Sequence, residues 1–152
     1  MSLALLRQTR SATVGPVLTL VGGALMLLSF PLDWSTNGDA SGDNPFHYPL
    51  TGGVAWIVVV ALGAIAGARQ LRVAEVRHVT PLIAVIAAGV ASLLVLVRIV
   101  AGARTVDAGG TTVELDRGTG MWLALIASTA ATVGTAITWL ATRSRPPDPA
   151  GA

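Results

Sequence analysis

Four long apolar runs separated by polar segments set the pattern of this chain. The run over 81–102 is apolar apart from Ser92 and Arg98. At a rise of 1.5 Å per residue, about 22 helical residues reach roughly 33 Å, which is enough to cross the hydrocarbon core of a bilayer. The pattern predicts four membrane-spanning helices, at about 12–32, 52–68, 81–102 and 119–141, after a cytoplasmic segment 1–11 and before a disordered tail 142–152.

The distribution of arginine predicts how these helices are oriented. Seven arginines lie on one side of the predicted spans: Arg7, Arg10, Arg69, Arg72, Arg77, Arg143 and Arg145. Only Arg98, Arg104 and Arg117 lie at or beyond the other side. Because basic residues near the ends of spans stay in the cytoplasm, the fold class expected is an all-α integral membrane four-helix bundle in a bacterial plasma membrane. Both termini are expected inside, and the loops 33–51 and 103–118 are expected outside.

Composition narrows the possible functions. Of the 152 residues, 53% are hydrophobic and 12% are charged, against about 25% charged residues in soluble domains. Four spans leave only short loops and tails, so no soluble catalytic domain fits. Cysteine is absent, which excludes disulfides, thiolate nucleophiles and thiolate metal ligands. We therefore expect neither an enzyme nor a bound cofactor, and we interpret the small net charge of +2 as a topology signal rather than a nucleic-acid-binding surface.

Small residues predict which helix faces pack closely, because lipid tails supply no hydrophobic drive between helices. They are Gly63 and Gly67 in a GxxxG pair, and Ala84, Ala87 and Ala91 along one face of the third span. The GxxxG pair fits either a seam within the bundle or a dimer face.

Arg98 continues the alanine face, about one turn before the third span ends. Its guanidinium fits three interpretations: it reaches the lipid headgroups, it pairs with an acid of the outer loops, or it serves a substrate or ion. The pairing hypothesis has the arginine facing the bundle, with Asp33, Glu114 or Asp116 as partner.

The four tryptophans predict where the membrane interfaces lie. Trp34, Trp56, Trp122 and Trp139 all fall near the ends of predicted spans, which is typical of an aromatic belt. The last two are separated by roughly 25 Å along a helix, so each would mark one interface.

A threonine stripe runs along the fourth span, at Thr129, Thr132, Thr135 and Thr138. Threonines in a span usually bond back to their own helix or across to a neighbour. A polar transport pathway is the alternative, but no ionisable group accompanies the stripe.

The first outer loop carries oxygen-bearing side chains at Asn37, Asp39, Ser41 and Asp43, as calcium loops do. The terminal bidentate glutamate and the correctly placed glycine are missing, which favours an ordinary solvated loop. His47 has no second histidine nearby, so no metal site is predicted. In the second outer loop, the alternation over 111–115 after two glycines predicts a short hairpin or strand.

The second and fourth spans open alike, with Thr51-Gly52-Gly53 before Trp56 and Thr119-Gly120 before Trp122. This likeness fits a duplicated two-helix unit, and shared interface chemistry would produce it as well. Together with Pro31-x-x-Trp34 and Arg117-Gly118-x-Gly120-x-Trp122, these motifs make the chain resemble small four-helix (tetraspan) uncharacterised membrane proteins of actinobacteria. The resemblance implies a four-helix membrane fold and brings no activity or functional residue.

Taken together, these features favour a non-catalytic membrane subunit or scaffold of a cell-envelope complex. Its expected partners are membrane lipids and other membrane or envelope proteins, or further copies of itself, and not nucleic acid. The alternative is a small transporter or channel component that uses Arg98 and the threonine stripe.

Overall fold

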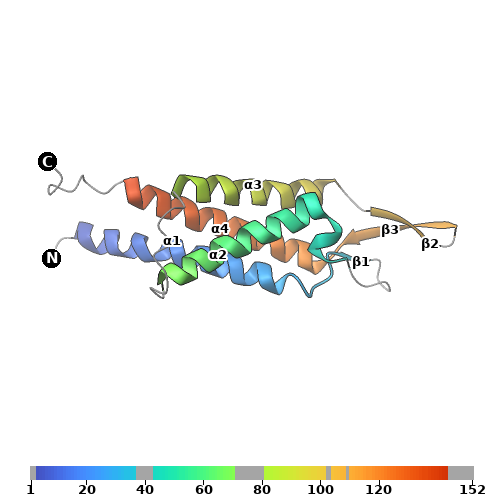
Figure 1. The fold of residues 1–152 in the computed structure, drawn as a ribbon, viewed down its shortest axis with the longest axis horizontal. Helices are drawn as coiled ribbons and strands as arrows, with labels where there is room; N and C mark the ends of the chain where they lie inside the picture. The colour runs from blue at the N-terminus through green and yellow to red at the C-terminus, as the bar shows by residue number, and fades with distance from the viewer. Residues whose placement is uncertain (1–2, 37–42, 71–80, 102–103, 109, 144–152) are drawn as a thin grey trace.

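The computed structural model describes residues 3–36, 43–70, 81–101, 104–108 and 110–143. Its helices are α1 (Leu3–Leu28), α2 (Val54–Gln70), α3 (Pro81–Val100) and α4 (Thr119–Arg143). Its strands are β1 (Ser35–Thr36), β2 (Arg104–Ala108) and β3 (Thr111–Arg117), and two short helical turns, η1 (Pro45–His47) and η2 (Pro49–Gly53), precede α2. Figure 1 shows the four helices side by side along the molecule, with α1 starting and α4 ending at one end and the strands at the other. We call these the termini end and the sheet end.

The predicted helical fold is confirmed. Three segments are long and apolar enough to cross a membrane, Pro49–Gln70, Pro81–Val100 and Thr119–Arg143, while Thr13–Leu28 is a shorter apolar stretch of α1. The first span differs most from its predicted limits, because α1 begins at Leu3 and ends at Leu28. Leucine, alanine, arginine and glutamine are strong helix formers, so the segment before residue 12 continues the helix. Pro16 consequently lies inside α1 and not in its first turn.

Adjacent glycines let α1 approach two helices at once. A Cβ atom on Gly22 would lie 2.7 Å from the carbonyl oxygen of Ala127 and 3.0 Å from the Cβ of Ala131, both on α4. A Cβ on Gly23 would lie 2.7 Å from the Cα of Gly63 on α2. Since real Cβ atoms essentially never come this close to backbone, neither position has room for a side chain.

The α1–α4 contact continues toward the termini end through Gly15 and Gly134. A Cβ on Gly134 would lie 2.6 Å from both the backbone nitrogen and the hydroxyl of Thr19. This contact is the most extensive between any two helices. The first and last helices of the chain therefore form the central pair of the bundle.

Helix α3 packs against α4 and less extensively against α2. Its buried face is made of Ala88, Ala91, Val95 and Ile99. Ser92 contacts the hydroxyl of Thr132 at 2.9 Å. Since Thr132 already donates its proton to the Ser128 carbonyl, Ser92 is the donor.

A three-stranded antiparallel sheet in the order β1-β3-β2 covers part of the sheet end. The β2–β3 hairpin runs in register from Arg104 opposite Leu115 to Ala108 opposite Thr111, which confirms the predicted hairpin. Strand β1 pairs with the base of β3, Ser35 opposite Arg117. The segments 33–51 and 103–118 therefore meet in one sheet.

Candidate functional site

The sheet end is closed by a tryptophan that is buried completely. Trp34 is 0% exposed, and its indole Nε1 donates to the carbonyl oxygen of Ser29 at 3.0 Å. Its backbone N–H donates to Asp43 at 2.8 Å, and its carbonyl accepts from the N–H of Gly118 at 3.0 Å. These three bonds join the end of α1, the loop that contains Asp43 and the residue before α4 around one tryptophan.

Glycines surround this indole because nothing larger fits. A Cβ on Gly52 would lie 2.9 Å from Cζ3 of Trp34, and a Cβ on Gly120 would lie 2.7 Å from its Cδ1. A Cβ on Gly118 would overlap the carbonyl oxygen of Asp33. The similar openings of the second and fourth spans thus have a shared packing role, since Gly52 and Gly120 contact the same ring.

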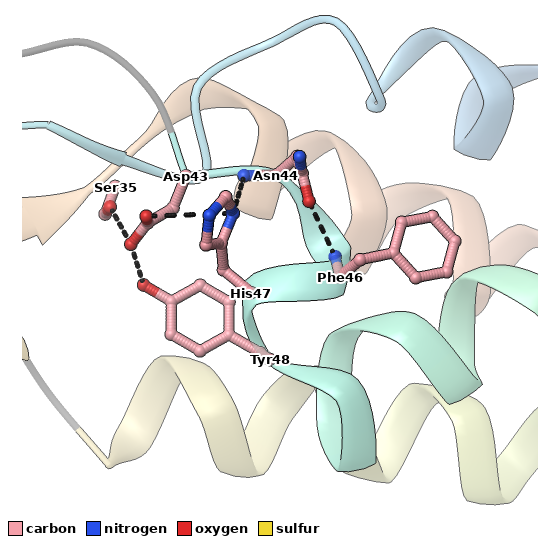
Figure 2. Close-up of polar contacts among 6 residues, drawn as sticks. All are labelled: Ser35, Asp43, Asn44, Phe46, His47 and Tyr48. Atoms are coloured by element: carbon pink, nitrogen blue, oxygen red, sulfur yellow. Dashed lines mark hydrogen bonds and ion pairs between the residues drawn. The ribbon is translucent and has the colours of Figure 1, made fainter.

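The carboxylate of Asp43 joins β1 to the turns before α2 (Figure 2). Its Oδ2 accepts from the hydroxyl of Ser35 at 2.8 Å and from that of Tyr48 at 2.7 Å. The guanidinium carbon of Arg98 lies 4.0 Å from the centroid of the Tyr48 ring, which is cation–π geometry. Asp43, Tyr48 and Arg98 therefore form a continuous chain of contacts from β1 to α3.

His47 lies beside Asp43. Its Nδ1 is 3.8 Å from Oδ1 of Asp43, and the same nitrogen accepts the backbone N–H of Asn44 at 3.2 Å. The side-chain oxygen of Asn44 accepts from the N–H of Phe46 at 2.9 Å, which completes a capping box for η1.

Arg98 does not form the expected ion pair. In the part of the chain that the structure describes, it makes no salt bridge with Asp33, Glu114 or Asp116, and its buried Nε has no hydrogen-bond partner. The aromatic face of Tyr48 takes the place of the carboxylate. The pairing hypothesis was wrong because it considered only charge and left out the tyrosine in the loop before α2.

Arg117 has a structural role that the sequence analysis missed. Its Nε donates to the carbonyl oxygen of Ile99 at 2.8 Å, and its Nη1 is 4.0 Å from Oδ1 of Asp116. The last carbonyls of a helix lack intrahelical partners and attract cations. The available signal was an arginine at the end of the predicted hairpin that follows the third span.

The other tryptophans occupy different environments from Trp34. Trp56 packs with Phe30 and Phe46, with ring centroids 5.6 to 6.1 Å apart within this cluster, and donates to the carbonyl of Met26 at 2.9 Å. Trp122 is 49% exposed.

Trp139 lies at the termini end beneath Arg143, whose guanidinium carbon is 4.2 Å from the ring centroid. Trp34 was expected at the membrane interface, and this expectation was wrong. Its wholly buried ring cannot contact a headgroup.

The predicted packing residues lie mostly inside the molecule. Gly63 contacts Gly23, and a Cβ on Gly67 would lie 3.0 Å from Cδ1 of Leu20, so both glycines of the GxxxG pair face α1. The pair is a seam within the bundle.

On α3, Ala91 is buried, while Ala84 and Ala87 are half-buried. The fully buried neighbour Ala88 was missed. The predicted face was rotated slightly away from the contact.

Each threonine of the stripe donates to a carbonyl of its own helix: Thr129 to Leu125, Thr132 to Ser128, Thr135 to Ala131 and Thr138 to Gly134. A cavity of about 60 Å³ toward the termini end is lined by Thr19, Leu62, Arg69, Ala84, Thr135, Thr138 and neighbouring apolar residues. Its wall is therefore largely apolar, with hydroxyls that are already engaged.

The calcium-like alternation lies outside the described residues, except for Asp43. Among the described residues, no three His, Cys, Asp or Glu side chains gather as a metal site. The basic turn over 71–78 also lies outside them.

Comparison of the chain with family models, with curated proteins and with solved structures found no match.

Proposed function

We propose that this is a multi-pass protein of a bacterial plasma membrane in which all four helices cross the bilayer. The apolar side-chain surface around the helices carries this proposal. Large exposed aliphatic residues lie on every helix, among them Leu27, Leu28, Ile57, Leu93, Leu96, Ile126 and Leu140. In water each square ångström of such surface costs about 25 cal/mol, and soluble monomers rarely expose large contiguous patches of it. Lipid removes that cost.

The length of α1 supports its inclusion among the spans. Its 26 residues reach about 39 Å, and it packs along α4, which is long and apolar enough to cross. A helix paired with a spanning neighbour over such a length shares its environment.

Arginine distribution supports an orientation with the termini end in the cytoplasm. Arg69 and Arg143 lie at this end of the described bundle, whereas Arg98 and Arg117 lie at the sheet end. Basic residues near span ends are retained in the cytoplasm. The sheet end then faces outward.

Single cysteines test this orientation cleanly, because the chain contains none. Thr112 on β3 and Thr142 at the end of α4 are both exposed. On intact cells, an impermeant thiol reagent should label Thr112→Cys and should label Thr142→Cys only after the membrane is opened. Labelling of Thr142→Cys alone on intact cells would show the opposite orientation. Labelling of both sites on intact cells would exclude the proposed topology.

We further propose that the protein acts by association, as a non-catalytic subunit or scaffold that presents its sheet end to partners. Support comes from how the polar groups there are used: Trp34, Asp43, Asn44 and Arg117 all bond within the molecule. Hydrogen bonds from Gly118 and Gly120 to the backbone of 33–34 hold the base of β3 to the bundle. The sheet is therefore a positioned surface rather than a loose loop.

The chemistry of that surface suggests its partners. Six acids fall in the two outer loops, Asp33, Asp39, Asp43, Asp107, Glu114 and Asp116, against three arginines at or beyond that side. Net negative charge favours membrane or envelope proteins with basic surfaces and disfavours nucleic acid.

The transporter alternative requires a polar path through the bundle. Because the stripe hydroxyls donate to their own helix, the stripe supports helix packing more than conduction. Arg98 lies toward one end, against Tyr48, where it does not extend such a path.

Purification in mild detergent after crosslinking tests the association directly. A variant with residues 105–116 replaced by a short glycine-serine turn should lose the partner that wild type retains. Arg143→Gln, at the opposite end, is the matched control and should keep the partner. Conversely, a partner-free monomer that conducts ions in liposomes, with the conductance lost in Arg98→Ala, would favour the transporter.

A further inference from the structure

Arg98 and Arg117, both toward the sheet end, differ in how their donors are used. The Nε of Arg98 is buried and has no hydrogen-bond partner among the described residues. Arg117 donates to the carbonyl of Ile99, by contrast, and is near Asp116. A positive, forked donor group at the sheet end thus lacks an anion within the described part of the chain.

The tyrosine beneath the guanidinium positions it without satisfying it. The guanidinium carbon lies 4.0 Å from the centroid of the Tyr48 ring, and this cation–π contact provides no hydrogen-bond acceptor for the N–H donors. Tyr48 is itself fixed through its hydroxyl, which donates to Asp43 at 2.7 Å. That carboxylate also accepts from the hydroxyl of Ser35.

Exposed aliphatic side chains occur on the two elements that carry Arg98 and follow Tyr48. On α3, Val97 and Val100 are 48% and 73% exposed, and in η2 Leu50 is 80% exposed, two residues after Tyr48. The η2 turn contacts α3. This part of the sheet end therefore carries both a cation and exposed aliphatic side chains.

We propose that Arg98, supported by Tyr48, binds a phosphate group, carried by a phospholipid of the outer leaflet or free in solution. The guanidinium fork matches the oxygens of a phosphate, and hydrogen bonds between charged groups are the strong ones. Val97, Val100 and Leu50 fit acyl chains better than they fit water. This inference rests on the proposed membrane insertion, which the cysteine labelling above tests without involving Arg98.

Native mass spectrometry of the full chain in detergent tests the site. The probes are dioleoyl phosphatidylglycerol, dioleoylglycerol with the same chains and no phosphate, and inorganic phosphate. Wild type should bind the phospholipid about tenfold more tightly than dioleoylglycerol, because a charge-assisted hydrogen bond is lost with the phosphate. Competition by inorganic phosphate at millimolar concentration would identify free phosphate as the source, and its failure to compete would identify the lipid.

Two variants separate a built site from a general charge effect. Arg98→Gln should weaken phospholipid binding about tenfold. Arg143→Gln removes the other arginine in a cation–π contact and should leave phospholipid binding within about twofold. Thermal unfolding and the cysteine labelling pattern verify that each variant is folded and inserted.

Two results would overturn the proposal. One is equal binding of phosphatidylglycerol and dioleoylglycerol by wild type, and this comparison needs no variant to fold. The other is an equal loss in Arg98→Gln and Arg143→Gln, since any interfacial arginine would then suffice. Either result could occur with insertion intact, so it would leave the membrane proposal standing.

Discussion

At the scale of single residues, the large side chain of Trp34 differs from the small residues around it, and this difference explains how the sheet end of the bundle is filled. The helix seams are built of glycine and alanine, which allow close approach but fill little volume. One indole supplies that volume at the sheet end, and Gly52 and Gly120 leave space for it. The ring thus joins segments that are far apart in sequence.

Substitution of Trp34 should lower stability more than that of any other tryptophan. We expect Trp34→Ala to reduce the free energy of unfolding by about 3–5 kcal/mol, through lost packing. Trp34→Phe should cost about 1–3 kcal/mol, because it leaves the Ser29 carbonyl without its indole partner. Thermal and denaturant unfolding in detergent measure both. The control Trp122→Phe, at a 49% exposed position, should change stability by less than about 0.5 kcal/mol.

Tyr48 and His47 both adjoin Asp43 but should differ in importance. Tyr48→Phe removes a 2.7 Å hydrogen bond in a partly buried position and should cost about 0.5–1.5 kcal/mol. His47 is half exposed and 3.8 Å from the carboxylate, so His47→Ala should cost less than Tyr48→Phe. Unfolding curves for the two variants and the parent decide this. A larger loss from His47→Ala than from Tyr48→Phe would contradict this ranking.

At the scale of elements, the seams between helices depend on where glycine occurs. Gly22 and Gly23 face α4 and α2 respectively, so α1 occupies the centre of the packing although it comes first in the chain. Helix α3 is the least covered of the three long apolar helices. Its attachment depends on small residues and on the Ser92–Thr132 hydrogen bond.

Two glycines within helices provide a matched pair for testing the seams. A Cβ on Gly63 would lie 2.6 Å from the Cα of Gly23, whereas a Cβ on Gly89 meets no described atom within 4 Å. We expect Gly63→Ala to destabilise the protein by about 1–3 kcal/mol through overpacking. Gly89→Ala should be neutral or stabilise it by up to about 1 kcal/mol, as alanine favours the helix. Denaturant unfolding of both variants in one detergent measures the difference.

The positions of Gly63 and Gly67 also decide between the bundle seam and the dimer face that the sequence left open for the GxxxG pair. Because both glycines face α1, their replacement by isoleucine should disrupt the monomer. A folded Gly63→Ile monomer with wild-type stability would contradict the observed seam.

At the scale of the whole molecule, the bundle and the hairpin are separable. The β2–β3 hairpin pairs mainly with itself, and the helices are joined at the sheet end by Trp34, Gly118 and Gly120. These residues lie outside the hairpin tip. The helices and the residues at the base of the sheet thus provide stability, whereas the hairpin provides the proposed binding surface.

Replacement of residues 105–116 by a short turn should therefore leave the bundle nearly as stable as the parent. We expect a loss of no more than about 1 kcal/mol, since β1 loses only one of its paired residues on β3. Circular dichroism melting in detergent measures this. An unfolded variant would show that the hairpin is part of the core and would remove it as an independent binding surface.

The chain's hydrophobic pattern alone determined the four helices and the hairpin. Long apolar runs make helices because each backbone group must bond within its own segment wherever water is excluded, and alternation after two glycines makes a hairpin for equally local reasons. The start of the first helix was predicted less accurately. The polar residues within 3–10 indicated a segment before the span, although the residues of this stretch also favour a helix.

Only the tertiary structure decided what the conspicuous residues do. Trp34 at the end of an apolar run has the same local pattern as a belt tryptophan, and its burial depends on glycines about 20 and 85 residues further along the chain. Charge alone predicted a carboxylate from one of three acids as the partner of Arg98. The structure instead places the guanidinium over the ring of Tyr48. Pairings between distant segments depend on how helices turn about their axes and approach each other, which hydrophobic periodicity does not specify to within one residue.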